Sequence, residues 1–234
     1  MKTQNLKAIW NSEYKRKQLM QGSEAIVSVK KFAKFLKKEL GLRGKPLPFE
    51  SFSVIDLGSG EGKHSAYFAE RGAKVWAIEI SDVAIKRAKQ NWPQLNINFI
   101  NQSFTEPLPL PNSSIDIALD VTSSNSLNAK ERKAYLKELK RVLKPGAFFF
   151  LRVPQIDTNA KKLMKKYPGK DPNSYILPQI NLQETAFNIQ TLKETYAQDF
   201  NIINIYTETH YSKFNKHSYK RNFLVAYLQK PPIQ

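Results

Sequence analysis

Three glycines at alternate positions, Gly58, Gly60 and Gly62, lie in the segment VIDLGSGEGKHS, residues 54–65. Strand-forming residues precede them and a helix-forming run follows, which is the context of a nucleotide-binding loop. Without Cβ atoms, such a loop can turn tightly and let a ligand lie against its backbone amides. A dinucleotide-binding loop has the spacing G-x-G-x-x-G, but Lys63 stands where its third glycine would fall. The spacing therefore indicates a nucleotide-type ligand other than a dinucleotide.

Two carboxylates flank this loop. Asp56 precedes Gly58 by two positions, and Glu79 ends the next strand-like run, 17 residues after Gly62. A carboxylate beside the loop disfavours a pyrophosphate and favours a cationic ligand. An acidic residue at the end of the second strand can accept hydrogen bonds from both hydroxyls of a ribose. Together the two carboxylates predict a nucleoside ligand that carries positive charge.

An alternation of strand-like and helix-like segments must position these residues. This alternation is typical of an α/β fold, in which helices cover both faces of a mostly parallel sheet. The expected strands are Phe52–Leu57, Lys74–Glu79, Asn96–Asn101, Ser114–Asp120, Ala147–Val153, Asn201–Thr207 and Asn222–Leu228. Helices are expected after the capping residues Ser23 and Ser81, and over the segment AKERKAYLKELKRVLKPG, which Pro145-Gly146 would end.

The segment VIDLGSGEGKHSAYFAERGAKVWAIEIS resembles the first motif of class I S-adenosylmethionine-dependent methyltransferases. The segments INQSFTEPLPLPNSSIDIALD and LKELKRVLKPGAFFFLRVP are similar to later parts of the same fold, and IWNSEYK resembles the N-terminal segment of small-molecule members such as tellurite-resistance-type enzymes. The resemblance implies a Rossmann-like seven-stranded sheet of order 3-2-1-4-5-7-6 with the last strand antiparallel. It also implies one domain over residues 1–234, an N-terminal helical segment over residues 1–48 that covers the site, and an insertion over residues 154–187 that acts as a lid.

The resemblance also implies a cofactor, S-adenosyl-L-methionine, which would leave as S-adenosyl-L-homocysteine. Glu79 would hold the ribose, Ile80 would contact the adenine, and Lys63 would offset the cofactor carboxylate. Gln102 stands where the family usually has an aspartate near the adenine amino group. The full set of residues expected to bind the cofactor is Asp56, Gly58, Ser59, Gly60, Gly62, Glu79, Ile80, Gln102, Ser103, Phe104 and Asp120.

Methyl transfer from a sulfonium is an in-line displacement, so the protein mainly aligns the acceptor and excludes water. No general base is obligatory; His210, Tyr211 and His217 are the clustered candidates for proton transfer, and an ordinary surface loop is the favoured interpretation. The acceptor is expected near Trp10, Tyr14, Asn125 and Tyr175. The absence of cysteine excludes a covalent cysteine adduct, and the sequence gives no reason to expect a metal.

The formal net charge is +17, with 29 lysines and 8 arginines among 37 basic residues. The excess of lysine favours a solvated surface over a dedicated nucleic-acid surface, because base and phosphate recognition more often uses arginine. The preferred function is methylation of an O or N atom of a small molecule. The alternatives are an RNA or protein methyltransferase that uses the basic surface and a non-catalytic cofactor-binding partner subunit. A cytoplasmic protein without membrane association is expected.

Overall fold

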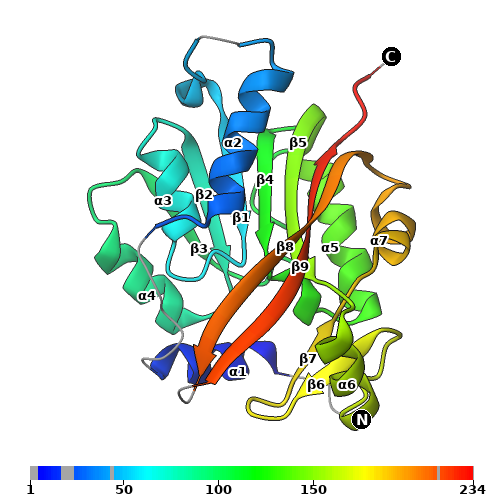
Figure 1. Ribbon diagram of the computed structural model, residues 1–234. Helices are drawn as coiled ribbons and strands as arrows, with labels where there is room; N and C mark the ends of the chain where they lie inside the picture. The colour runs from blue at the N-terminus through cyan, green and yellow to red at the C-terminus, as the bar shows by residue number, and fades with distance from the viewer. Residues whose placement is uncertain (1–4, 17–23, 43–44, 215–216, 234) are drawn as a thin grey trace.

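The computed structural model describes residues 5–16, 24–42, 45–214 and 217–233, and for 212–219 only the backbone of the strands. A seven-stranded sheet with the order β3-β2-β1-β4-β5-β9-β8 forms its centre (Figure 1). The strands are β1 Ser53–Leu57, β2 Lys74–Glu79, β3 Ile97–Asn101, β4 Ile115–Val121, β5 Leu143–Pro154, β8 Asn201–Phe214 and β9 His217–Gln229. The strands β1 to β5 pair in parallel, whereas β9 is antiparallel to β5. The expected order and the antiparallel last strand are confirmed.

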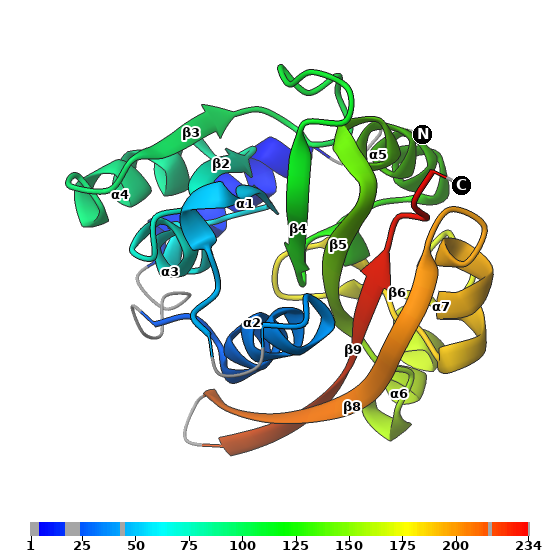
Figure 2. The ribbon, with the colours of Figure 1, turned by 90° about the horizontal axis from the view of Figure 1, so that it is seen from above.

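Helices cover both faces of this sheet. They are α1 Leu6–Lys15, α2 Val27–Glu39, α3 Lys63–Ala69, α4 Asp82–Asn91, α5 Ala129–Val142, α6 Thr158–Lys166 and α7 Ile189–Tyr196. Figure 2 shows α2 and α3 on one side of β4 and β5, with α5 and α7 on the other. Each face of the sheet has its own hydrophobic core, and neighbouring residues of β5 point into different ones. Phe150 packs with Phe32 of α2 in one core, and Phe149 packs with Tyr196 of α7 in the other. Both faces of the parallel strands are thereby buried.

Local signals explain most helix ends. Ser81 caps α4 by accepting a hydrogen bond from the Ala84 amide at 3.2 Å, as predicted. Asn128 and Glu131 form a capping box at the start of α5. The predicted start of α2 is wrong: the helix begins at Val27 without a side-chain cap, and Ser23 lies outside the described residues.

The boundary between α5 and β5 also differs from the prediction. The helix ends at Val142 and the strand begins at Leu143, so Pro145 and Gly146 lie inside β5 instead of between the two elements. Gly146 has a φ of 80°, and the register between β4 and β5 shifts at this point. A bulge lets the strand absorb the Pro-Gly pair, because an extra residue need not join the ladder.

Residues 154–187 form a small unit at the same end of the sheet as α1 (Figure 1). It contains α6 and the antiparallel strands β6 Ser174–Leu177 and β7 Leu182–Thr185. Ala160, Tyr175 and Ala186 form its core. None of the helices in the described part of the chain is long and apolar enough to cross a lipid bilayer.

Candidate active site

A cavity of about 130 Å³ lies at the carboxyl ends of β1, β2 and β4, beneath α1. In open parallel sheets this edge is where ligands bind. The side chains and backbone that line the cavity are those of Leu6, Trp10, Tyr14, Gly58, Glu79, Ile80, Ser103, Phe104, Val121, Thr122, Ser123, Ser126 and Leu127. The cavity thus joins α1, the glycine loop and the segments that follow β2, β3 and β4.

The glycine loop brings bare backbone to the cavity. Gly60 has a φ of 56°, and a Cβ built on it would lie 2.5 Å from the hydroxyl oxygen of Tyr14. A side chain at this position would be strained by the backbone angle and would collide with α1. Gly58 lines the cavity, and Gly62 precedes the first residue of α3. The hydroxyl of Ser59, within the loop, is buried and has no hydrogen-bond partner among the described residues.

Glu79 presents a fixed carboxylate to this cavity. Its Oε2 atom accepts a hydrogen bond from the Gly60 amide at 3.0 Å, and its Oε1 atom accepts one from the Ser81 amide at 2.8 Å. The residue is only 5% exposed, and burial raises the pKa of its carboxyl above the ordinary value. Each carboxylate oxygen can accept a further hydrogen bond, so Glu79 can take two hydroxyl donors without losing its orientation.

Asp56 and Asp120 lie behind the cavity wall and do not line it. Asp56 accepts a hydrogen bond from the Ser65 hydroxyl at 2.6 Å, and burial raises its pKa to about 7. Asp120 accepts hydrogen bonds from the amides of Ser123 and Ser124, each at 3.1 Å. Burial raises the pKa of Asp120 as well. Asp120 therefore orients the segment after β4, while Asp56 lies beneath the glycine loop and supplies negative potential there only in its ionised form.

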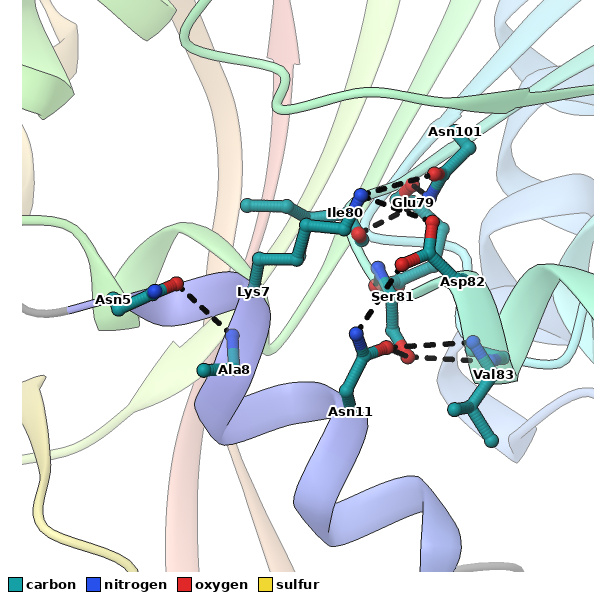
Figure 3. Close-up of polar contacts among 11 residues, drawn as sticks. Asn5, Lys7, Ala8, Asn11, Glu79, Ile80, Ser81, Asp82, Val83 and Asn101 are labelled. Carbon is teal, nitrogen blue, oxygen red and sulfur yellow. Dashed lines mark hydrogen bonds and ion pairs between the residues drawn. The ribbon is translucent and has the colours of Figure 1, made fainter.

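The helix α1 closes the cavity from outside with Leu6, Trp10 and Tyr14. Its other side is attached to the start of α4 (Figure 3). The Asn11 side chain accepts a hydrogen bond from the Ser81 hydroxyl at 2.7 Å and donates one to Asp82 at 3.3 Å. Burial, followed by the negative charge of Glu79, raises the pKa of Tyr14, so its hydroxyl stays protonated and can donate.

The segment after β3 divides in two. Ser103 and Phe104 line the cavity, and with Ile80 they give an apolar wall for a planar base. Gln102 does not line it, because its amide donates to the Pro107 carbonyl at 2.8 Å. The expectation that Gln102 contacts the adenine stays a prediction, and it would require the side chain to leave Pro107.

The remaining predicted residues lie away from the cavity. Asn125 and Tyr175 both donate to Glu184, at 3.2 and 2.8 Å, and neither lines the cavity wall. His210 and Tyr211 are exposed residues of β8, in the part of the β8–β9 hairpin that extends beyond β5. The side chain of His217 lies outside the described residues. Neither His210 nor Tyr211 lines the cavity wall.

Sequence reasoning missed most of the wall that follows β4. Val121, Thr122, Ser123 and Ser126 line the cavity, and the hydroxyl of Ser126 finds no partner in the described part of the chain. The polar run DVTSSN at the end of the fourth strand could have indicated this part of the wall. The carboxyl ends of parallel strands meet at one edge of the sheet, so polar residues that follow a strand lie near the ligand site. Thr122, with a φ of 62°, makes the turn that directs this run toward the cavity.

Comparisons with known proteins agree with this geometry. Residues 54–146 match the family described as a methyltransferase domain. The chain is 31% identical over 114 residues to demethylmenaquinone methyltransferase from Chlorobaculum tepidum, covering 48% of this chain and 44% of that protein. The chain spans about half, or less, of the length of the curated relatives it matches first.

Solved structures extend the likeness to the whole fold. A SAM-dependent methyltransferase from Methanosarcina mazei superposes with a TM-score of 0.66 at 26% identity, covering 79% of this chain and 94% of that one. The 1,6-didemethyltoxoflavin-N1-methyltransferase of Burkholderia thailandensis was solved with bound S-adenosylhomocysteine. It superposes with a TM-score of 0.66 at 20% identity, covering 97% of this chain and 87% of that one.

The sheet order and the glycine loop define the class I methyltransferase fold. Together with the methyltransferase domain matched over residues 54–146, they support a class I S-adenosylmethionine-dependent methyltransferase. S-adenosylmethionine is accordingly its cofactor. The cavity fits that group: Glu79 offers two acceptors for a diol, Gly60 has no side chain in the path, and Ile80 with Phe104 forms an apolar wall.

Proposed function

We propose that the protein transfers the methyl group of S-adenosylmethionine to an O or N atom of a small-molecule acceptor. The observation that carries this proposal is the enclosure of the cavity by Trp10 and Tyr14 of α1. A cover directly above the glycine loop suits a small acceptor, whereas a polymer needs an open trough. Demethylmenaquinone methyltransferase and the toxoflavin enzyme, named for small molecules, lend support to this proposal.

When bound, the cofactor supplies an electrophilic methyl group on a positively charged sulfur. Glu79 would hold the cofactor's ribose, and the loop amides of residues 58–60 would be available to its methionyl part. Asp56 beneath the loop stabilises positive charge. Trp10, Tyr14 and Leu127 exclude water from the line of displacement, which strengthens the electrostatic interactions inside the cavity.

Residues 1–48 and 154–187 act in this proposal as covers of the site. The cavity of about 130 Å³ is smaller than ligand pockets of roughly 300–1,000 Å³. A nucleoside cofactor therefore requires α1 to move outward before it closes again over the bound cofactor. The hydrogen bonds of Asn11 to the start of α4 are the contacts that such a movement would break or shift.

The test uses S-adenosylmethionine with a tritiated methyl group and a cell extract divided into small-molecule, RNA and protein fractions. We expect label in the small-molecule fraction, and much less of it at a subsaturating cofactor concentration when Glu79→Ala replaces the native protein. Label found only in RNA or protein would contradict the proposed acceptor class. Binding of S-adenosylhomocysteine without transfer to any fraction would instead favour a non-catalytic partner subunit.

A further inference from the structure

Three cationic side chains lie close enough to interact electrostatically, next to the cavity wall that follows β4. They are Lys63 at the start of α3, Arg152 near the end of β5 and Arg221 in β9, and we call them the cationic cluster. Arg152 pairs across the ladder with the cavity-lining Val121, and its Nη1 atom donates to the side chain of the cavity-lining Thr122 at 3.0 Å. Arg152 therefore lies directly behind the cavity wall after β4, and neither it nor Lys63 lines the cavity.

The two arginines of the cluster are held firmly. Arg152 is 7% exposed, pairs with Glu208 at 2.8 Å, and places its guanidinium carbon 3.5 Å from the ring centre of Phe223. Arg221 lies over the same ring at 5.3 Å and pairs with Glu184 at 2.9 Å. Two stacked guanidiniums on one buried ring form a rigid, positively charged wall.

Lys63 is different, because it has no acidic partner. No carboxylate in the described residues lies within ion-pair distance of its ammonium group, and the segments left undescribed contain no Asp or Glu. The side chain is partly buried, and burial together with the charge of Arg152 lowers its pKa. Next to it, the Nδ1 atom of the buried His64 also has no hydrogen-bond partner in the described part of the chain.

The charges of this region do not balance. Three cations (Lys63, Arg152 and Arg221) face two carboxylates (Glu184 and Glu208), which leaves one positive charge without a partner. A partly buried charge without a partner costs folding free energy, and such a cost is offset when an anion binds. His64 stays neutral, since burial and the charges of Lys63 and Arg152 lower its pKa to about 3. A neutral imidazole can donate a hydrogen bond to the same anion.

Two anions could bind to the cationic cluster: an anionic group of the methyl acceptor and the carboxylate of the cofactor. The position of the cluster distinguishes between them. In the sheet, β5 lies three strands from β2, so Arg152 is about 14 Å from the strand of Glu79 at a spacing of about 4.8 Å per strand. A cofactor held by Glu79 would have its ribose at the end of β2, and the glycine loop follows β1, so the ends of β4 and β5 would be left for the acceptor. The cofactor's own carboxylate is the rival anion, because Lys63 follows the glycine loop directly.

We propose that Lys63 and Arg152 bind an anionic group, a carboxylate or a phosphate, of the methyl acceptor. This proposal rests on the proposed function, since it assigns the substrate class of the same site. The anion is bound by the Lys63 ammonium, by the donor positions of Arg152 that Glu208 and Thr122 leave free, and by the His64 imidazole. Specificity then comes from charge at the β5 side of the cavity, and methyl transfer takes place at the Thr122–Ser126 side.

The test measures binding of 4-fluorobenzoate and its neutral isostere 4-fluorobenzamide by ¹⁹F NMR, in the presence of saturating S-adenosylhomocysteine. We expect the native protein to bind the carboxylate about tenfold more tightly than the amide, as one charge-assisted hydrogen bond would give. Lys63→Gln should remove this preference and Lys63→Arg should keep most of it. Lys89→Gln, on the exposed face of α4, is the matched control for loss of one charge and should behave like the native protein.

Two further arms identify the anion. Competition by inorganic phosphate and titration of 4-fluorophenyl phosphate show whether phosphate or carboxylate binds more tightly, and either preference supports the proposal. Equal binding of carboxylate and amide would overturn it. The proposal would also be overturned if Lys89→Gln lost the preference for the carboxylate as fully as Lys63→Gln does. That result would mean adventitious attraction of the anion to a basic surface.

The rival anion is tested by calorimetry with S-adenosylhomocysteine and 5′-methylthioadenosine, which lacks the amino-acid part. If Lys63→Gln weakens S-adenosylhomocysteine about tenfold and leaves 5′-methylthioadenosine unchanged, Lys63 serves the cofactor and the proposal is wrong. We expect Lys63→Gln to bind S-adenosylhomocysteine and 5′-methylthioadenosine with affinities within about twofold of the native values. Failure of the native protein to bind S-adenosylhomocysteine at all would refute the proposed function instead, so the two failures are distinguishable.

Discussion

The ionisation of Asp56 is sensitive to pH near neutrality. Its carboxyl is buried beneath the glycine loop, and burial raises its pKa from the ordinary 3.8 to about 7. Between these two values the folded protein retains a proton that the unfolded chain has released. The stability contributed by the neutral carboxyl is therefore complete at low pH and is lost as pH rises through about 7.

We expect this effect in equilibrium unfolding of the protein without cofactor. Between about pH 4.5 and 7, the free energy of unfolding of the native protein should fall by up to about 1.4 kcal/mol per pH unit relative to Asp56→Asn. Chemical denaturation of both proteins across this range measures the difference. Parallel curves for the two proteins would show that Asp56 is already ionised in the folded state.

Individual residues of the site were predictable to different degrees. Gly58, Gly60, Asp56 and Glu79 follow one another in a short segment, so their shared location follows from one strand–loop–helix–strand pattern. The cationic cluster could not be found in this way. Arg152 and Arg221 come from strands 69 positions apart in the sequence and meet on Phe223 only because β9 pairs with β5.

At the scale of elements, α1 is the helix that lies over the cavity, and in the proposed function its position would control access. Its inner side lines the cavity with Trp10 and Tyr14, and its outer attachment depends on Asn11 and Lys7 (Figure 3). These contacts are few, and the ion pair of Lys7 with Asp82 is exposed, so it contributes little. The attachment is therefore weak enough to open for ligand exchange.

Asn11→Ala should shift α1 toward the open position. We expect faster amide hydrogen exchange in α1 and affinity for S-adenosylhomocysteine weakened by up to about tenfold, because hydrogen bonds worth about 0.5–1.5 kcal/mol each are lost. Gln90→Ala, on the exposed surface of α4, is the control. Unchanged exchange in α1 would mean that Asn11 does not hold the helix in place.

Strand and helix identities were predicted well because alternation, capping residues and apolar stripes are local signals. The length of the β8–β9 hairpin was not predicted, since its outer part carries polar residues such as Thr209 and His210 that contribute no alternating apolar pattern. The start of α2 was also missed. Ser23 was expected to cap the helix, but the helix begins at Val27, after Ile26, which has no capping side chain.

At the scale of the whole molecule, part of the net charge of +17 is carried by the exposed side of α2. Lys31, Lys34 and Lys38 lie on its exposed side, and Phe32 and Leu36 are buried against the sheet. This is the charge pattern of a solvated amphipathic helix. A large positive charge nevertheless attracts RNA without selectivity when the salt concentration is low.

We expect RNA binding that depends on salt and not on the active site. The affinity for a single-stranded RNA should fall steeply between 50 and 200 mM salt, as displacement of counterions requires, roughly following the number of phosphates contacted. Saturating S-adenosylhomocysteine should leave it unchanged. Binding that resists salt and strengthens with S-adenosylhomocysteine would favour RNA as the acceptor.

The central claim is that the carboxyl edge of β1 and β2 binds S-adenosylmethionine through the glycine loop and Glu79. Calorimetric titration of S-adenosylhomocysteine into the native protein and Glu79→Ala tests it, with NAD as the comparison ligand and Glu70→Ala as the exposed control. We expect 1:1 binding by the native protein and the control, no measurable binding of NAD, and a loss of about 1–3 kcal/mol in Glu79→Ala with its thermal unfolding still cooperative. Equal affinity of native protein and Glu79→Ala, or preference for NAD, would contradict it.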